Sequence, residues 1–453
     1  MGTRGDATSG EGWAPLARPG SASGPRRDVR TPSGWSVVTE SEDAVDGEHQ
    51  GPLVVFSGGT AFNSTASVLK RRTTSVAYVL PVSDDGGSTK VIVDVLGGPA
   101  VGDIRSRCLR LSNDRTREGL AVRNLLGYRL DADDEEFARA EWLRIVEGSH
   151  ALWINVGDPY KHTIRAFLVH FHTQVLSSGA ASKFTYANGS IGNFFFAGAR
   201  TFFQSIEAAI FMYHRVSGVP PRSEVLPVIV SERRISLAAE LASGVVLRGQ
   251  NTISHPTATK PRAQHESGHA SSSTVVSKED TIPLASPIKR VFYLSSDGDH
   301  EVVPAANPAV IRELAAARAI VFGMGSLYTS IVPCLVLPGV GEAVRDAQVP
   351  KLLLLNGTPD RESGDLAASG FVHAITNALN RKGTSAEIDC PVSAYITKVV
   401  VAKGSQVQVD LAALETIGVE VVPCKSVERA SKDGSRTLVH FDTAALSDLL
   451  AAL

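Results

Sequence analysis

The stretch that decides the fold runs from Leu53 to Asp103 and contains three short motifs. It reads Leu53-Val-Val-Phe-Ser57-Gly58-Gly59-Thr60, then Val82-Ser-Asp84-Asp85-Gly86-Gly87-Ser88, then Val101-Gly102-Asp103-Ile104-Arg105. In the first two motifs an apolar run ends in paired glycines, and the first is followed by residues with helical spacing. This order is typical of a buried strand, a tight turn and a helix N-terminus.

The turn at Gly58, Gly59 and Thr60 suits a phosphate group, because backbone N–H groups and the positive end of a helix dipole face the same point. Neighbouring parallel strands would place the Asp84 to Ser88 turn along the same edge, where open α/β sheets bind ligands. Each turn alone is equally compatible with an ordinary solvated turn, since Asp and Gly favour turns. Together, the two turns predict phosphate-binding glycines beside paired carboxylates.

A later stretch repeats the pattern of strand, glycine turn and helix start. The apolar run 319–322 leads into Gly323-Met324-Gly325-Ser326-Leu327-Tyr328-Thr329-Ser330. Glycines admit a close phosphate, and the hydroxyl groups of Ser326, Thr329 and Ser330 can donate hydrogen bonds beside the helix terminus. Two such turns suit a diphosphate, or a nucleotide together with a second phosphorylated ligand. A further buried strand, 351–355, ends at Asn356.

Several well-known motifs are absent from the sequence. It has neither the Gly-x-Gly-x-x-Gly dinucleotide fingerprint nor the Gly-Lys-Ser/Thr of a phosphate-binding NTPase loop, which argues against nicotinamide dehydrogenases and ordinary ATPases. Ser326 also lacks the Gly-x-Ser-x-Gly elbow of a hydrolase nucleophile.

Polar residues at two further helix starts are candidates for the site. Asp103 is predicted as the N-cap of its helix. Arg105 lies in the first turn, where the dipole disfavours a cation, and this conflict fits an anion held nearby. Gly192 and Asn193 open an apolar helix, which indicates close approach of a ligand or another backbone. An Asn193 that caps a neighbouring segment is an equally good interpretation.

Composition indicates a soluble protein. Of 453 residues, 43% are hydrophobic and 20% charged, with a net charge of −2 and scattered cysteines. That charge provides no attraction for nucleic acid or an anionic membrane, and no apolar run is long enough to span a bilayer. We expect a cytoplasmic location, a small-molecule nucleotide-type ligand, no nucleic-acid partner and no membrane. A homodimer is compatible with the sequence.

The chain reads as one domain with two low-complexity parts. Residues 1–50 are rich in Gly, Ser, Pro and charge, which predicts a disordered tail. Residues 51–453 alternate strands and helices, with a Ser-, Thr- and His-rich loop insertion at about 250–286. Late strands are predicted at 225–230, 244–247, 288–294, 396–401, 419–422 and 438–441.

The order of these motifs resembles the 2-phospho-L-lactate transferase (CofD-like) family, which also contains the bacterial gluconeogenesis factors (YvcK-like). The resemblance covers about residues 53–445 without the insertion, and its specific blocks are Asp84-Asp85-Gly86-Gly87 and Gly325-Ser-Leu-Tyr-Thr-Ser330. It implies a three-layer α/β/α Rossmann-like fold with a largely parallel sheet. It also implies either of two functions. One is magnesium-assisted transfer of a phospho-acyl-type group from a nucleoside-diphosphate-linked donor to a hydroxyl, with a nucleoside monophosphate leaving. The other is nucleotide-sugar binding by a non-catalytic regulator of carbon metabolism.

The resemblance also assigns roles to residues. Gly58, Gly59 and Thr60 would hold phosphate, and the Asp84–Asp85 pair would bind Mg²⁺ or orient the attacking hydroxyl, which suits magnesium's preference for a few carboxylates plus phosphate oxygens. Catalytic roles are expected for Asp84, Asp85 and Asp103. The remaining expected ligand-binding residues are Gly86, Gly87, Ser88, Arg105, Asn193, Gly323, Gly325, Ser326, Tyr328, Thr329, Ser330 and Asn356. The chain departs from the family at Ala61, where a glycine is usual, and in the block that begins at Asn356.

Overall fold

The computed structural model describes residues 51–453 except 74, 84–85, 255–282, 296–299 and 432–433. These residues belong to one unit that spans Gln50–Leu453. The predicted tail at 1–50, most of the predicted insertion and the Asp84–Asp85 pair lie outside the described residues.

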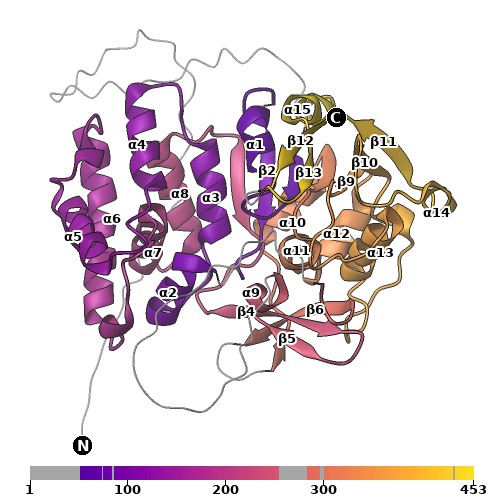
Figure 1. The fold of residues 1–453 in the computed structure, drawn as a ribbon, viewed down its shortest axis with the longest axis horizontal. Helices are drawn as coiled ribbons and strands as arrows, with labels where there is room; N and C mark the ends of the chain where they lie inside the picture. Colours follow the sequence, from indigo (N-terminus) through magenta and orange to yellow (C-terminus); the bar gives the residue numbers. More distant parts are fainter. Residues whose placement is uncertain (1–50, 74, 84–85, 255–282, 296–299, 432–433) are drawn as a thin grey trace, which may run out of the picture. The chain divides into compact units, whose positions relative to one another are not determined.

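The predicted α/β class is confirmed, because a seven-stranded sheet forms the centre of this unit (Figure 1). The strand order is β11-β10-β9-β8-β1-β2-β3, and every neighbouring pair runs parallel. Its strands are β1 (Leu53–Phe56), β2 (Val76–Leu80), β3 (Ser223–Pro227), β8 (Ala319–Phe322), β9 (Lys351–Leu354), β10 (Lys398–Ala402) and β11 (Glu420–Cys424).

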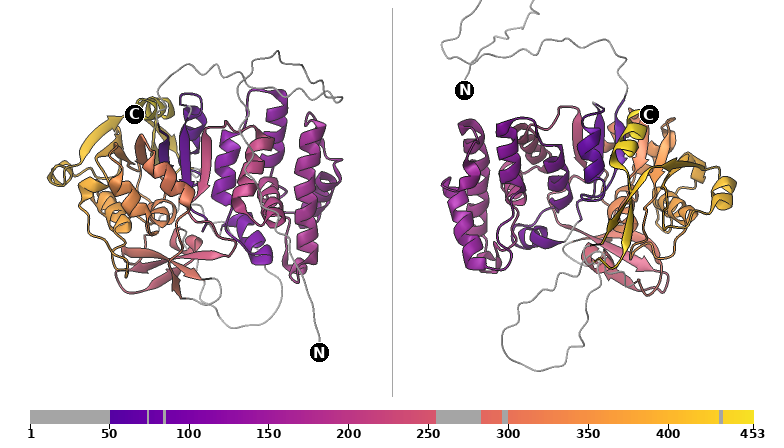
Figure 2. Two further views of the ribbon diagram at one scale, coloured as in Figure 1. Left: turned by 180° about the vertical axis from the view of Figure 1, so that it is seen from behind. Right: turned by 45° about the horizontal axis from the view of Figure 1, so that its top comes forward.

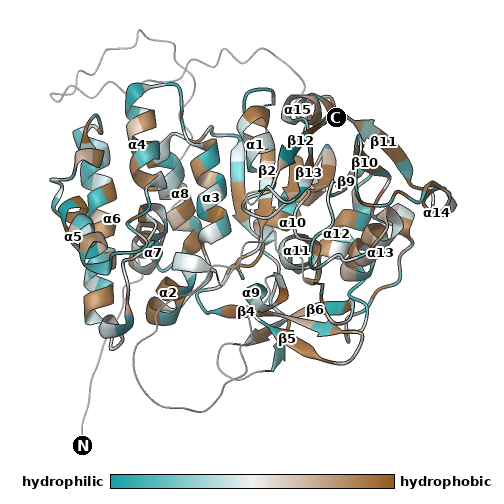
Figure 3. Cartoon of the chain, viewed as in Figure 1, coloured by the Kyte–Doolittle hydropathy of each residue, from teal (hydrophilic) through white to brown (hydrophobic). Residues whose placement is uncertain are grey.

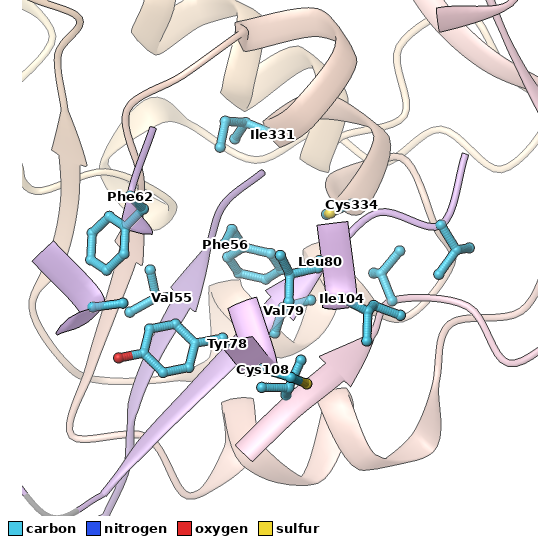
Figure 4. Close-up of a cluster of buried hydrophobic side chains, with 14 of the residues drawn as sticks. Val55, Phe56, Phe62, Tyr78, Val79, Leu80, Ile104, Cys108, Ile331 and Cys334 are labelled. Atoms are coloured by element: carbon cyan, nitrogen blue, oxygen red, sulfur yellow. The ribbon is translucent and has the colours of Figure 1, made fainter. Parts of the chain in front are cut away.

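The inner strands read as continuous apolar runs because both of their faces are covered. Every residue of β1, β2, β8 and β9 is buried. Figure 4 shows this core, with Phe56 from β1 and Tyr78 and Val79 from β2 grouped with Ile104 of the helix that begins at Gly102. Phe56 also stacks on Phe322, with ring centroids 5.6 Å apart. The two glycine turns therefore start from rigid, fully packed strands.

The helices extend from the sheet in several groups. The early ones are α1 (Asn63–Leu69), α2 (Gly87–Leu96), α3 (Gly102–Leu111), α4 (Arg117–Gly127), α5 (Glu135–Glu147), α6 (Asp158–Ser177), α7 (Ile191–Phe203) and α8 (Ile206–Ser217). The later ones are α9 (Gln250–Ser254), α10 (Pro308–Ala315), α11 (Val332–Leu335), α12 (Val340–Asp346), α13 (Ala368–Leu379), α14 (Leu411–Thr416) and α15 (Thr443–Ala451). In this layered arrangement α1 packs against α3 and α15, whereas α12 packs against α10 and α13.

The helices α3 to α8 lie side by side in one group, as both views of Figure 2 show. They bury a cluster of aromatic rings, in which Trp142 of α5 packs edge-on against Phe194 of α7, with centroids 5.0 Å apart. Figure 3 shows the expected alternation of hydrophilic and hydrophobic residues on the outer helices α4 and α5. In α5 the buried positions recur at helical spacing, from Ala138 to Trp142 and Ile145.

Two smaller β structures complete the unit. A four-stranded sheet has the order β5-β4-β6-β7, with β4 (Ile235–Leu241), β5 (Val246–Arg248), β6 (Ile288–Ser295) and β7 (Glu301–Val302). An antiparallel pair joins β12 (Ser426–Ala430) to β13 (Thr437–Phe441). The sequence analysis missed β4 and β12, because neither strand stands out as an apolar run.

The predicted insertion was wrong at its start. Gln250–Ser254 forms the helix α9, and Gln250, Ile253 and Ser254 are buried. This segment therefore belongs to the packed fold, since its apolar residue is buried despite polar neighbours.

No single helix among the described residues is long and apolar enough to cross a membrane. One pair of helical segments, Leu327–Leu335 with Val340–Asp346, passes the test of length and composition together and is bent by 80°.

Candidate functional site

The candidate site lies where the strand order of the central sheet reverses. β1 pairs with β2 on one side and with β8 on the other, and Phe56 is in register with both Val79 and Phe322. The three strands therefore end at the same level, and the turns after β1 and β8 are neighbours. In open α/β sheets this switch point is where ligands bind. A cavity of about 640 Å³ opens there, within the size range typical of ligand pockets.

Six of the predicted ligand-binding residues line this cavity: Gly58, Thr60, Gly325, Ser326, Ser330 and Asn356. They come from the ends of β1, β8 and β9, which are remote in sequence. The predicted convergence of two glycine turns at one cleft is thus reproduced by the packing of the parallel strands.

The first turn, Gly58-Gly59-Thr60, is held from beneath by side chains of α1 and α3. Ser106 donates a hydrogen bond from its Oγ to the carbonyl of Gly59 at 2.7 Å, and Asn63 donates its amide to the same carbonyl. The guanidinium of Arg107 donates to the carbonyl of Gly58 at 3.0 Å. Because these carbonyls are engaged below the turn, its conformation is set by the protein itself.

The Arg107 guanidinium is a structural cation under this turn. Its side chain is fully buried, and it also donates to Ser57 Oγ at 3.1 Å and lies over the ring of Tyr78 at 4.8 Å. Burial lowers its pKa to about 10, so the group remains charged at neutral pH. A positive charge buried below the turn favours an anion above it.

The backbone N–H groups of Gly58, Gly59 and Thr60 have no hydrogen-bond acceptor within the part of the chain that the structure describes. Buried amides are nearly always paired, and Gly58 and Gly59 are buried. Three successive open amides form a concave binding element for an anion. This is the strongest single indication of a ligand site in the molecule.

Both glycines are required by close neighbours. A Cβ on Gly58 would lie 2.5 Å from Ser330 Oγ, and a Cβ on Gly59 would lie 2.6 Å from the Cα of Asp103. Any larger residue would push the turn away from α3 or from the segment after β8. The contact also places Asp103 directly beside the turn.

Asp103 is not the N-cap of α3, so that prediction was wrong. The N-cap is Val101, and Asp103 lies in the first turn of the helix. Its position is decided by the contact with Gly59 instead of by capping. Asp84 and Asp85 lie outside the described residues, and Asp103 is therefore the predicted catalytic carboxylate whose surroundings the structure provides.

The predicted residues around α2 form a second cluster, which does not line the cavity. Asn193 of α7 donates its amide to Ser88 Oγ at 3.1 Å and to Thr89 Oγ1 at 3.3 Å, and it accepts a hydrogen bond from Arg105 Nε at 3.1 Å. Of the two interpretations of Asn193, the contact with a neighbouring segment is the one observed. Gly86 and Gly87 adjoin this cluster at the start of α2.

Gly192 permits a close backbone approach, as the sequence predicted. A Cβ there would lie 2.5 Å from the carbonyl oxygen of Leu126. A residue that the sequence analysis missed, Arg129, joins the same cluster and donates to Ser88 Oγ at 3.5 Å and to the carbonyl of Asn188 at 2.8 Å. Burial and the nearby Arg105 lower the pKa of Arg129. Two guanidinium groups therefore lie near the start of α2.

The second glycine turn differs from the first because it is closed by the protein. Gly325 and Asn356 exchange two hydrogen bonds of 2.9 Å each, between the Gly325 backbone and the Asn356 side chain. Gly323 donates its amide to the carbonyl of Phe56 at 2.8 Å. Gly325 has φ of 132°, a conformation that favours glycine.

The helix start after this turn accepts a carboxylate of the chain itself. Tyr328 and Thr329 both donate their amides to Glu362 at 3.0 Å, and the Thr329 hydroxyl donates to the same group at 2.5 Å. Thr329 is buried. The structure thus places Glu362 where the sequence predicted that Tyr328 and Thr329 would meet a ligand.

Glu362 is buried with a second carboxylate nearby. Burial, and then the charge of Asp360, raise its pKa to about 7. Asp360 caps its own loop, since its Oδ1 accepts from Ser363 Oγ at 2.7 Å and from the Ser363 amide at 2.8 Å. The loop after Asn356 is therefore folded around these two acidic groups.

One wall of the cavity was not anticipated from the sequence. It is formed by Arg429, Leu438, Val439, His440 and Phe441 of the β12–β13 pair, together with Thr443 at the start of α15 and Arg110 of α3. Burial and the charge of Arg429 lower the pKa of His440. These residues carry no recognisable motif, so only their place in the fold identifies them.

Among the described residues no group of three or more His, Cys, Asp or Glu side chains could hold a metal ion. The predicted magnesium ligands Asp84 and Asp85 are outside that set.

Taken together, the fold and the site define an open, doubly wound α/β protein with a ligand-sized cleft at its switch point. The family model for 2-phospho-L-lactate transferase CofD matches residues 53–427. The chain therefore belongs to this family, as its motifs indicated.

Similar proteins extend the comparison. The chain is 30% identical over 443 residues to "Uncharacterized protein YNL011C" of Saccharomyces cerevisiae, a match that covers 85% of this chain and 97% of the relative. It is 26% identical to a gluconeogenesis factor of Halalkalibacterium halodurans, over 71% of this chain and 72% of the relative. The crystal structure of protein BH3568 from Bacillus halodurans has the same fold, with a TM-score of 0.59, 20% identity and coverage of 88% and 99%.

Proposed function

We propose that this chain binds a nucleoside-diphosphate-linked ligand in the switch-point cleft and transfers a phosphorus-containing group from it to a hydroxyl acceptor. The observation that carries the proposal is the row of open amides at Gly58, Gly59 and Thr60. Membership of the 2-phospho-L-lactate transferase CofD family supports this class of chemistry. The cavity of about 640 Å³ is large enough for such a ligand.

In this proposal the first turn holds the phosphate that is attacked. The acceptor oxygen forms a bond to that phosphorus, and the bond to the bridging oxygen breaks. The nucleoside monophosphate leaves with the electron pair, and the acceptor proton passes to a carboxylate. Asp103 is the described carboxylate beside the turn, and Asp84 and Asp85 are proposed to share this role. Such a transfer depends mainly on positioning and on neutralisation of charge.

Magnesium is proposed as the assisting ion. Mg²⁺ is bound by one or two carboxylates together with substrate phosphates and water, and Asp103 adjoining an open phosphate turn fits that type of donor set. Asp84, Asp85 and Asp103 would hold the ion, which when bound would neutralise charge on the phosphates. The cluster of Ser88, Arg105 and Asn193 is proposed to border the acceptor.

A second candidate function is a regulator that binds a nucleotide sugar without turnover. Two observations favour it: relatives are named gluconeogenesis factors, and Glu362 fills the second predicted anion site. In a regulator the first turn would bind the ligand in the same way, while the carboxylates would only orient it.

A combined binding and turnover experiment separates the two functions. Thermal shifts of the purified protein would be measured with guanosine and uridine nucleotides, nucleotide sugars and a deazaflavin, each with and without Mg²⁺. A ligand at 100 times its Kd should stabilise the protein by about 2.7 kcal/mol. The transferase is supported by release of nucleoside monophosphate that depends on Mg²⁺ and is lost in Asp103→Asn.

The same data contain the contrary outcomes. Binding without any product, under every metal condition, would establish the regulator and reject the transferase. An Asp103→Asn variant with unchanged turnover would reject the proposed role of that carboxylate. No shift with any ligand would reject both functions.

A further inference from the structure

The wall formed by β12, β13 and α15 lies almost wholly beyond the part of the chain that the family model matches. That match ends at residue 427, whereas Arg429, His440, Phe441 and Thr443 all line the cavity. The C-terminal segment therefore contributes to the same cleft as the glycine turns without being part of the common family pattern. Such a wall is a natural place for a specificity that belongs to this chain.

This wall is basic. Arg429 of β12 and Arg110 of α3 both line the cavity, and neither has an acidic side chain within 4.0 Å among the residues that the structure describes. The acidic lining residue, Asp360, is engaged by its own loop through the amides of Glu362 and Ser363. The two guanidinium groups are therefore not neutralised by the cleft itself.

Paired arginines elsewhere in the molecule make this exceptional. Arg381 forms two hydrogen bonds with Glu342, at 2.8 and 2.9 Å, and Arg290 bridges Glu240 and Glu301. A solvated arginine on an open surface needs no partner. Two of them that face one ligand-sized cavity, however, raise the local concentration of anions there.

The opposite requirement, a surface for the less polar part of a ligand, is also met. Leu438 and Phe441 of β13 and Met324 of the second turn line the same cavity. The first turn can take up the diphosphate, as argued above. What remains for Arg110 and Arg429 is a further acidic group, because a guanidinium pairs with a carboxylate or a phosphate through charge-assisted hydrogen bonds.

We propose that Arg110 and Arg429 form an anion subsite for a second acidic group of the ligand, so that the chain prefers nucleoside diphosphates whose substituent carries a carboxylate or phosphate over those with a neutral substituent. This inference rests on the proposed binding function and narrows its ligand class. It does not depend on whether group transfer takes place.

Two matched ligands test it. Uridine diphosphate glucuronic acid and uridine diphosphate glucose differ in a single carboxylate, and the guanosine diphosphate sugars provide a second, neutral reference. Titration calorimetry with the full chain should give an affinity for the glucuronic acid compound at least 5-fold higher than for the glucose compound. Arg429→Gln and Arg110→Gln should each reduce that ratio towards 1 and change the Kd for the glucose compound by less than about 2-fold.

The same hairpin provides a matched control. Arg436 is exposed in this hairpin but does not line the cavity, and Arg436→Gln should leave the ratio unchanged. Charge reversal in Arg429→Glu should invert the preference. Because Arg429 and Arg110 are exposed, these variants should fold, which their thermal midpoints would verify.

Three outcomes would overturn the inference. Equal affinity of the wild-type protein for the two uridine compounds would reject the subsite and leave the proposed function standing. Equal loss of both ligands in Arg429→Gln would show that this residue binds the diphosphate instead. If the wild-type protein binds none of the nucleotides, the proposed function fails, and the subsite fails with it.

Discussion

The turns after β1 and β8 share one sequence pattern but have different fates in the fold. Both follow a fully buried strand of four residues and contain closely spaced glycines. The first turn keeps the amides of Gly58, Gly59 and Thr60 open, whereas the helix start after the second donates its amides to Glu362. The difference teaches that an anion-binding turn can be used for a ligand or for a carboxylate of the protein, and that the local sequence is the same in both cases.

The largest expected effect comes from emptying the second turn. Glu362→Ala should lower the free energy of unfolding by about 3 kcal/mol, because the Tyr328 and Thr329 amides and the Thr329 hydroxyl lose their acceptor. Urea unfolding would measure the loss. Inorganic phosphate should stabilise this variant more than the wild-type protein, since the turn would then resemble the first one. A loss below about 0.5 kcal/mol would mean that the carboxylate is not what holds the turn.

A change in the first turn should remove ligand binding. In Gly59→Ala the added Cβ would lie 2.6 Å from the Cα of Asp103, so the turn must move and its amides lose their alignment. We expect the affinity for a nucleotide ligand to fall about 100-fold, which corresponds to about 2.7 kcal/mol. Calorimetry would measure it.

Gly179→Ala is the control for that substitution, because no atom lies within 4 Å of a Cβ at this exposed position. It should bind as the wild-type protein does. If Gly59→Ala also kept full affinity, the open amides would not be the ligand site.

The buried carboxylate also predicts a pH dependence. The folded protein raises the pKa of Glu362 from its usual 4.5 to about 7, so between these values the folded state binds a proton that the unfolded state has released. The resulting stabilisation is fully present below pH 4.5 and is lost as the pH rises through 7. The stability of the wild-type protein should therefore fall by about 2 kcal/mol from pH 5 to pH 8 relative to Glu362→Gln.

Thermal unfolding of both proteins across that pH range isolates this group, because the glutamine variant lacks only its titration. Asp360→Asn should make the slope shallower, since it removes the neighbouring charge that helps to raise the pKa of Glu362. Parallel stability curves for wild type and Glu362→Gln would contradict the prediction.

A smaller effect is expected from the link between the turn and the loop after β9. Asn356→Ala removes both hydrogen bonds to the Gly325 backbone and should cost about 1–2 kcal/mol of stability. Asn377→Ala on α13, at a position with no such link, serves for comparison. Urea unfolding of the pair would distinguish a specific loss from a general one.

Much of the framework could be predicted from the sequence, because its signals are local. The apolar runs that became β1, β2, β8 and β9 were identified with ends close to those observed, since an apolar run closed by glycine is decided within a few residues. The arrangement of the first and later turns along one edge followed from the rule for parallel sheets. The exposed or polar strands β4 and β12 were missed for the same reason, as they lack that local signal.

The sequence by itself determined which segments are strands and glycine turns, and that two of those turns can receive an anion. Only the tertiary structure decided that Glu362 fills one of them, that Asn193 reaches Ser88 across 105 residues, and that Arg429 faces the cleft. The physical reason is range. Backbone conformation and burial pattern depend on neighbours in the chain, whereas the partner of a hydrogen bond or a charge depends on which remote segments the packed sheet brings together.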